Sequence, residues 1–328
     1  MSTERHVVTV LIFERYGNQL LEEMGKIALK YPELQIACFL HFNDFKESNH
    51  WGNTDILVLH IRSQTELDES LANNPIKWVH SLSAGVDTII HSELLRSMNI
   101  PLTNAKGAYD RGIAEWCITS MLYFQKNMQL LFEQQKNHSY KLFQMPTLYR
   151  TTLVILGYGS IGRYVAKLAK VFGMRIIGIK QTASEPDEYA EEIVEISRLH
   201  EFLPQADFFV MALPKHSLTV DIIGAKELSL LKNSAVLINV GRGINLDEGA
   251  LIQALYTRTI RGAALDVFKN EPLSADSRLW DTPNILLTPH NCAVVDNVIE
   301  LSVNVFEKHL KEFFEGSIKS SVDFNKGY

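Results

Sequence analysis

The stretch LVILGYGSIG at residues 153–162 constrains this chain more than any other, because it combines a buried strand, a glycine turn and a helix start. A parallel strand covered on both faces needs a continuous apolar run. Gly157 permits a tight turn, Gly159 lets a pyrophosphate approach bare backbone, and Gly162 lets the helix pack closely on the strand. The alternative is an ordinary glycine-rich turn. We predict a dinucleotide site whose phosphates face the helix N-terminus.

Strand-like apolar runs alternate with helical patterns along the rest of the chain. This alternation predicts parallel sheets with crossover helices, and a length of 328 residues suggests two domains. The expected fold is α/β with two doubly wound parallel-sheet domains and a cleft between them. The predicted strands are residues 7–13, 35–40, 55–60, 77–82, 153–156, 174–179, 208–213, 235–240, 262–267 and 285–288.

The order of these patterns predicts a discontinuous first domain. Composition changes at residues 100–104, and the helical segment 296–315 follows a second sheet that is already complete, so it should pack back on the first. We therefore predict that residues 1–103 and 291–328 form one discontinuous domain. Residues 104–290 form the predicted NAD(P)-binding Rossmann domain. Its approach helix, residues 113–135, is apolar nearly all round, which indicates burial between domains or subunits.

Charge and cysteine usage favour small-molecule partners in a reducing compartment. The net charge of −6 provides no basic surface for nucleic acid or membrane, and the first apolar run is too short to span a bilayer. The N-terminus lacks the features of a secretory signal, so we expect a cytoplasmic protein. Cys38, Cys117 and Cys292 are odd in number and widely spaced, which predicts free thiols and no metal site.

Three polar residues follow successive strands of the second sheet. Arg242, Glu271 and His290 come just after the strands at 235–240, 262–267 and 285–288, so they should meet at the edge where the glycine turn binds its ligand. A guanidinium matches the carboxylate of a 2-oxo acid, and a His held by Glu can give or take the proton during hydride transfer. Each of the three residues taken alone could have a purely structural role. Their occurrence after three successive strands of one sheet predicts that they act together in catalysis.

The first domain contains a candidate anion loop. Ser83, Ala84 and Gly85 follow a predicted strand, and such a small-residue loop leaves backbone N–H groups open to an anion. A plain turn is the alternative at this position.

The chain resembles the D-isomer-specific 2-hydroxyacid dehydrogenases over essentially its whole length, and most closely the pattern of glyoxylate and hydroxypyruvate reductases. The resemblance rests on SAGVD (83–87), the segment 107–116, LGYGSIG (156–162), AD (206–207), LP (213–214), INVGRG (238–243), ALDVF (264–268), EP (271–272), LW (279–280), PN (283–284) and TPH (288–290).

This resemblance implies that the domain of residues 1–103 and 291–328 is a flavodoxin-like substrate-binding domain. It implies as well that Arg242, Glu271 and His290 are catalytic and that the loop at 83–85, Ser83, Ala84 and Gly85, holds the substrate carboxylate. It also implies a homodimer through the helix beginning near Ile113 and a contact of Asp266 with the nicotinamide amide. The cofactor contacts we assign are Gly157, Tyr158, Gly159, Ser160, Ile161, Gly162, Lys180, Gln181, Thr182, Leu213, Pro214, Val240, Gly241 and Asp266.

Two departures from the family pattern bear on specificity. The strand at 174–179 ends in Lys180-Gln181-Thr182 and not in an acid that would hold the ribose hydroxyls and repel a 2′-phosphate. We predict a preference for NADP(H); if Lys180 points to solvent, NAD(H) binds as well. Asn291 and Cys292 follow His290 where the family more often has an apolar residue, which either alters the pocket or is ordinary packing.

We therefore predict the reduction of a small 2-oxo acid to the D-2-hydroxy acid, with glyoxylate or hydroxypyruvate suggested by similarity and a larger keto acid as the alternative. A nucleotide-sensing, corepressor-like scaffold would need neither the arginine nor the His and Glu pair. A dehydrogenase of another small oxyanion is a further alternative, although the similar formate enzymes have Gln in place of Glu271.

Overall fold

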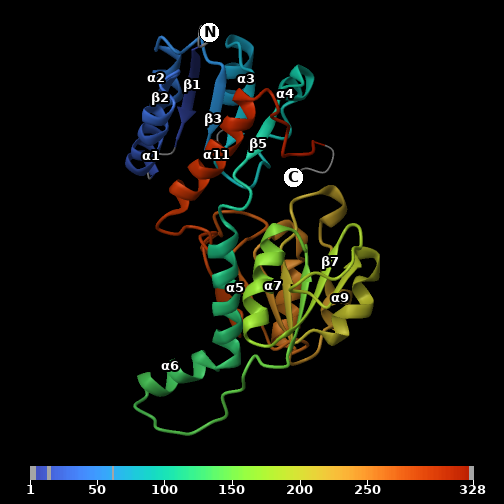
Figure 1. Ribbon diagram of the computed structural model, residues 1–328. Coiled ribbons are helices and arrows are strands. Elements are labelled where there is room, and N and C mark those ends of the chain that lie inside the picture. The colour runs from blue at the N-terminus through green and yellow to red at the C-terminus, as the bar shows by residue number, and fades with distance from the viewer. Residues whose placement is uncertain (1–4, 13–15, 61–62, 325–328) are drawn as a thin grey trace. The chain divides into compact units, whose positions relative to one another are not determined.

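The computed structural model describes residues 5–12, 16–60 and 63–324. The chain divides into two compact units, residues 1–109 with 296–328 and residues 110–295 (Figure 1). These divisions lie six and five residues beyond the boundaries expected at 103 and 290. Each unit is an α/β fold built on one parallel sheet.

The first unit contains a five-stranded sheet in the order β2-β1-β3-β4-β5, with every pair parallel. This is the flavodoxin-like strand order. Its elements are β1 (His6–Leu11), α1 (Gly17–Lys30), β2 (Leu34–Phe39), α2 (Phe42–Lys46), β3 (Ile56–Leu59), α3 (Gln64–Asn73), β4 (Trp78–Ser81), α4 (Glu93–Met98), β5 (Leu102–Asn104) and α11 (Val298–Phe314).

Helix α11 completes this unit from the C-terminal end of the chain. It packs against α1 and β5, and the ring of Phe306 stacks on that of Trp78 in β4 at a centroid distance of 5.2 Å. Both rings are fully buried. A second apolar cluster of the same unit joins the strands to α3 and α4 and includes Leu67 and Leu95. The segment 298–314 is therefore part of the first unit's core.

The second unit contains a seven-stranded parallel sheet in the order β12-β11-β10-β9-β6-β7-β8. Strand β6, which leads into the glycine turn, lies between β9 and β7, where the strand order reverses as in a Rossmann fold. The elements are α5 (Asp110–Gln125), α6 (Met128–Lys136), β6 (Thr152–Leu156), α7 (Ser160–Val171), β7 (Arg175–Lys180), β8 (Glu192–Glu195), α8 (Leu199–Phe202), β9 (Phe208–Met211), α9 (Ala225–Leu230), β10 (Val236–Asn239), α10 (Glu248–Tyr256), β11 (Gly262–Leu265) and β12 (Ile285–Leu287).

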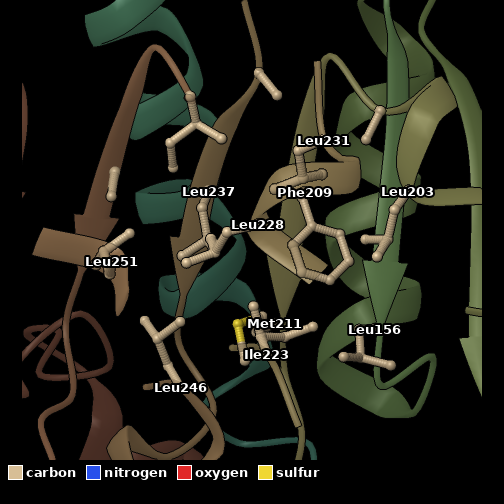
Figure 2. Packing of buried hydrophobic residues seen from close by; sticks show 14 of the residues in the cluster. Leu156, Leu203, Phe209, Met211, Ile223, Leu228, Leu231, Leu237, Leu246 and Leu251 are labelled. Carbon is tan, nitrogen blue, oxygen red and sulfur yellow. The ribbon is translucent and has the colours of Figure 1, made fainter. Parts of the chain in front are cut away.

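Apolar side chains cover both faces of this second sheet. Phe209, Met211 and Leu237 lie on one face with Leu228 of α9, as Figure 2 shows, and residues of α10 join the same cluster. Helices α5 and α7 pack side by side and contact strands of the sheet (Figure 1). Burial on both faces explains why these strands read as unbroken apolar runs.

The single helix expected at residues 113–135 is wrong in one respect, because the structure has two helices there. Helix α5 ends at Gln125, Asn127 adopts a left-handed conformation with φ of 49°, and α6 begins at Met128. Arg261 donates to the Phe124 carbonyl and to Asn127 Oδ1, which fixes the break. The apolar face of α6 does not enter a core, since none of its residues is buried.

Other differences from the predicted strands are local. Strand β5 falls in a segment where the sequence shows only a change in composition, and β8 offers just two apolar residues between glutamates, so neither was predicted. The predicted first strand extends to Phe13, which lies outside the described residues, and the observed strand ends at Leu11. Within the part of the chain that the structure describes, no helix is both long and apolar enough to cross a bilayer.

Candidate active site

The glycine turn joins β6 to α7 as the sequence predicts. Gly157 has a φ of 100°, and a Cβ there would lie 2.6 Å from the Ala212 carbonyl oxygen. A Cβ on Gly162 would lie 2.4 Å from the Gly157 oxygen, so this glycine allows the close helix packing. A Cβ on Gly159 would meet no atom within 4 Å, which leaves its backbone approachable. The turn therefore has the open backbone that a phosphate group requires.

The segment after β9 lies between this turn and the turn that carries Arg242. A Cβ added to Gly157 or to Gly241 would collide first with the backbone of Ala212 and Leu213. Both glycines therefore allow their turns to pack closely against this segment. Leu213 itself is buried, as is Val240, whose N–H donates to the Met211 carbonyl. Three strand ends thus meet at one edge of the second sheet.

Arg242 follows β10 in a turn that a buried asparagine shapes. Asn239 accepts the Gly241 N–H at 3.1 Å and donates to the Arg242 carbonyl at 3.2 Å, and it is fully buried. A Cβ on Gly243 would lie only 1.9 Å from the Phe268 carbonyl carbon. The glycine after Arg242 therefore lets this turn press against the segment that leads to Glu271. Asn239 was not among the predicted site residues, although a polar residue at the end of an apolar strand was a visible signal.

Glu271 and His290 form a hydrogen-bonded pair. Glu271 Oε1 accepts the Phe268 N–H at 2.9 Å, and Oε2 accepts from His290 Nδ1 at 2.7 Å. With Nδ1 engaged by the carboxylate, Nε2 is the ring nitrogen that can exchange a proton with a ligand. Half of the His290 side chain is exposed. The pair therefore combines a fixed ring orientation with access from outside.

Electrostatics within the pair favour a protonated imidazole. The hydrogen bond to Glu271 raises the pKa of His290 above its ordinary value, in spite of the opposing effect of burial. Burial by itself would raise the pKa of Glu271, but the hydrogen bonds from His290 and from the Phe268 N–H lower it on balance. Arg242 lies close enough to act on both groups, lowering each pKa. The arrangement therefore favours the protonated form of His290.

Asp266 holds the turn that presents His290. Its buried carboxylate accepts the Thr288 hydroxyl at 2.6 Å and the N–H groups of Asn291 and Cys292 at 3.1 and 3.2 Å. The Asp266 carbonyl accepts the His290 N–H at 2.8 Å. These bonds maintain the positive φ of His290, 51°. Asp266 is thus a structural anchor of the His290 turn, whatever else it contacts.

Cys292 belongs to the same turn and is partly buried. Burial, followed by the neighbouring Asp266 carboxylate, raises the pKa of its thiol. The thiol therefore stays protonated near neutral pH, as an inert packing group does. No cluster of three or more His, Cys, Asp or Glu side chains within the described residues could hold a metal ion.

The end of β7 lies directly beside the glycine turn. The N–H groups of Gly157 and Tyr158 both donate to the Ile179 carbonyl at 2.9 Å, one residue before Lys180. Lys180 is half-buried, and within the described residues no carboxylate pairs with its ammonium group. Gln181 and Thr182 are exposed. Of the other predicted cofactor residues, Ser160 bonds to Asp110 at 3.4 Å and Ile161 is half-buried on α7.

The predicted anion loop belongs to the first unit. The Ser83 carbonyl accepts the Ala105 N–H, and the Ala84 carbonyl accepts Asn104 Nδ2 at 2.7 Å. Within the described residues, no acceptor engages the N–H groups of Ala84 and Gly85. The loop therefore presents two backbone donors on a fixed turn, which suits a carboxylate. Arg242, Glu271 and His290 belong to the second unit.

The chain is similar to known proteins over most of its length. A family model for the NAD binding domain of D-isomer specific 2-hydroxyacid dehydrogenases matches residues 118–292. A D-3-phosphoglycerate dehydrogenase from Methanocaldococcus jannaschii is 31% identical over 92% of this chain, and the match spans 57% of that longer protein. A glyoxylate reductase from Thermococcus gammatolerans is 30% identical over 82% of this chain and 83% of its own length.

A solved structure shares both domains. An NADPH-dependent glyoxylate/hydroxypyruvate reductase from Sinorhizobium meliloti, in complex with NADP and sulfate, is 27% identical with a TM-score of 0.81. The match covers 99% of this chain and all of that one.

Proposed function

The chain belongs to the D-isomer specific 2-hydroxyacid dehydrogenase family, and from this premise we propose that it reduces a small 2-oxo acid to the D-2-hydroxy acid with a nicotinamide cofactor. The observation that carries the proposal is the bond between His290 Nδ1 and Glu271 Oε2 beside Arg242. Proton delivery and carboxylate binding are the two tasks that this reduction requires of the protein.

In the proposed reaction, Arg242 binds the substrate carboxylate. A carboxylate is also the ligand that we propose for the N–H groups of Ala84 and Gly85 in the first unit. His290 delivers the proton from Nε2 to the carbonyl oxygen at C2, and Glu271 holds the ring and stabilises its charged form. In the reverse direction the neutral imidazole takes that proton back. Because Asp266 fixes the His290 backbone, the ring needs little reorganisation before it acts.

The glycine turn fits a dinucleotide. Its open side at Gly159 and the adjoining N-terminus of α7 suit a pyrophosphate. The backbone of Leu213 lies against both this turn and the Gly241 turn. When bound, the nicotinamide supplies or accepts the hydride at C2 of the substrate. The residues that would hold the dinucleotide are 157–162, Leu213, Pro214, Val240, Gly241 and Asp266.

We propose a preference for NADP(H) over NAD(H). Lys180, next to the turn and without a paired carboxylate within the described residues, supports binding of a 2′-phosphate. The NADP in the similar Sinorhizobium meliloti structure supports it as well. Comparing kcat/KM for NADPH and NADH tests this directly; a clear preference for NADH would overturn it.

Glyoxylate and hydroxypyruvate are the proposed substrates, supported by the similar reductases. The test is a spectrophotometric screen of about ten 2-oxo acids, small, branched and aromatic, with both cofactors. Cofactor oxidation is expected with the small acids. Bound cofactor without oxidation of any acid would instead favour a nucleotide-sensing scaffold. We expect the walls of the substrate pocket to come from side chains of the first domain around residues 58–62 and 81–87, of which residues 61 and 62 lie outside the described residues.

We propose that the protein is a cytoplasmic homodimer. Helix α6 and the segment after it extend away from the second sheet (Figure 1) and expose Phe132, Tyr140 and Leu142, the last two by 95% and 91%. Large apolar side chains exposed on an extended arm are typical of an interface. Replacing Phe132 and Leu142 with Glu should convert a dimer to a monomer in sedimentation experiments; an unchanged mass would contradict this interface. The three free thiols support a reducing compartment.

A further inference from the structure

The second residue of the glycine motif, Tyr158, packs its side chain against β7. Its ring is buried and lies on β7, where a Cβ on Gly178 would be 2.5 Å from Tyr158 Cγ. Its hydroxyl donates to Asp187 Oδ1 at 3.0 Å. The motif therefore contains a tyrosine whose polar end reaches the loop after β7, residues 181–191.

Asp187 gathers four donors within this loop and around it. Besides Tyr158, Oδ1 accepts the N–H groups of Tyr189 and Ala190 at 2.9 and 3.0 Å, and Oδ2 accepts Arg163 Nε at 2.8 Å. Desolvation opposes ionisation, yet these bonds hold the pKa of Asp187 at about 2, so the carboxylate is charged at every working pH.

Arg163, on the first turn of α7, completes the connection. Its second nitrogen donates to Glu188 at 2.9 Å, and its guanidinium lies 4.7 Å from the centre of the Tyr189 ring. The loop is thus fastened to the glycine turn through Tyr158 and to the following helix through Arg163. Arg163 is paired with two carboxylates and is therefore not available to a ligand phosphate, whereas no carboxylate among the described residues pairs with Lys180.

We propose that Tyr158 and Asp187 are positioning residues for cofactor selection, because they clamp the 181–191 loop, which begins directly after Lys180 at the end of β7, and so hold Gln181 and Thr182 beside the phosphate turn. The proposal rests on the proposed NADP(H)-dependent function. A fixed loop pays no ordering cost when it binds the 2′-phosphate end of the cofactor. NADH, which lacks that phosphate, gains little from the same clamp.

The experiment is direct binding of NADPH and NADH, followed by cofactor fluorescence, to the whole protein and to Tyr158→Phe. The variant keeps the ring against Gly178 and removes only the hydroxyl. We expect the Kd for NADPH to rise about 5- to 10-fold, as for a lost hydrogen bond to a charged group, and the Kd for NADH to change less than about 2-fold.

Tyr164→Phe is the matched control, since Tyr164 lies on α7, directly after the turn that carries Tyr158, and its hydroxyl makes no hydrogen bond within the described residues. Its affinities should equal those of the unaltered protein. Asp187→Ala should weaken NADPH binding more than Tyr158→Phe does, in the same direction. Lys180→Ala should remove most of the NADPH advantage, and adding Tyr158→Phe to it should change little, because the clamp acts through that segment.

Three results would overturn the proposal. They are an equal loss of affinity for NADPH and NADH in Tyr158→Phe, an unchanged affinity for NADPH in that variant, and full additivity of the effects of Tyr158→Phe and Lys180→Ala on NADPH binding. Failure of the proposed function has a different signature, namely intact NADPH binding without reduction of any 2-oxo acid. Binding measurements therefore test the role of Tyr158 and Asp187 in cofactor selection independently of turnover.

Discussion

His290 Nδ1 lies 2.7 Å from Glu271 Oε2, and this bond joins two loops that are 19 residues apart in the chain. Strands β11 and β12 are adjacent and parallel, so the loops that follow them emerge side by side. The bond sets both the orientation and the charge of the imidazole. Its removal should therefore change the pH dependence of the reaction more than the binding of substrate.

Glu271→Gln should move the pH profile of keto-acid reduction toward lower pH. Reduction requires protonated His290, so kcat/KM falls as pH rises through the His290 pKa. Glu271 raises that pKa, and its neutral replacement lowers it. Profiles of kcat/KM between pH 5 and 9 test this shift. A variant whose falling limb coincides with that of the unaltered protein would argue against the pairing.

Arg242→Ala should raise KM for the keto acid and lower kcat, with a loss of about 10²- to 10³-fold in kcat/KM, because it removes a donor used in binding and in the transition state. Arg242→Lys keeps the charge but loses the planar fork and should recover only part of the activity. Steady-state kinetics across the keto-acid panel measure both. Near-normal kinetics for Arg242→Ala on every acid would refute the assigned role.

Gly243→Ala should disrupt the contact between the Arg242 turn and Phe268. The added methyl would lie 1.9 Å from a backbone carbon, and we expect a loss of about 1–3 kcal/mol in stability together with reduced kcat/KM. Thermal unfolding and kinetics are the measurements. Gly25→Ala, at an exposed position of α1 with no atom within 4 Å, is the control and should stabilise by about 1 kcal/mol. Equal behaviour of the two variants would contradict the packing argument.

His80 should make the first unit sensitive to acid. It is fully buried, its Nδ1 lies 2.7 Å from Thr103 Oγ1, and burial, with a smaller effect of His309, holds its pKa well below 6.5. The unfolded chain therefore binds a proton that the folded chain does not as pH falls below about 6.5, so stability is full above that pH and is lost below it. The loss approaches about 1.4 kcal/mol per pH unit from this group.

Urea unfolding of the unaltered protein and of His80→Gln, between pH 5 and 7.5, measures this contribution. The glutamine does not titrate, so the difference in unfolding free energy between the two proteins should shrink as pH falls. A difference independent of pH would show that His80 does not titrate with folding.

Several features followed from local sequence alone. Unbroken apolar runs such as residues 153–156 belong to strands covered on both faces, and this periodicity predicted both parallel sheets. Strand ends at one edge of a parallel sheet converge, so the positions of Arg242, Glu271 and His290 after three successive strands were enough to predict that they lie near one another. Their catalytic roles stay predictions until the variants are measured.

Tertiary contacts decided what local patterns could not. The helix pattern at residues 113–135 continues through Asn127, but Arg261, more than a hundred residues away, captures Phe124 and Asn127 and ends the helix. Likewise the glycine motif predicts only a cofactor contact for Tyr158, whereas the structure packs its ring against Gly178 and bonds its hydroxyl to Asp187. The sequence by itself determined the sheets and the turn, because periodicity and glycine content act locally; the partners of buried polar side chains depend on distant residues, and only the folded structure brings these together.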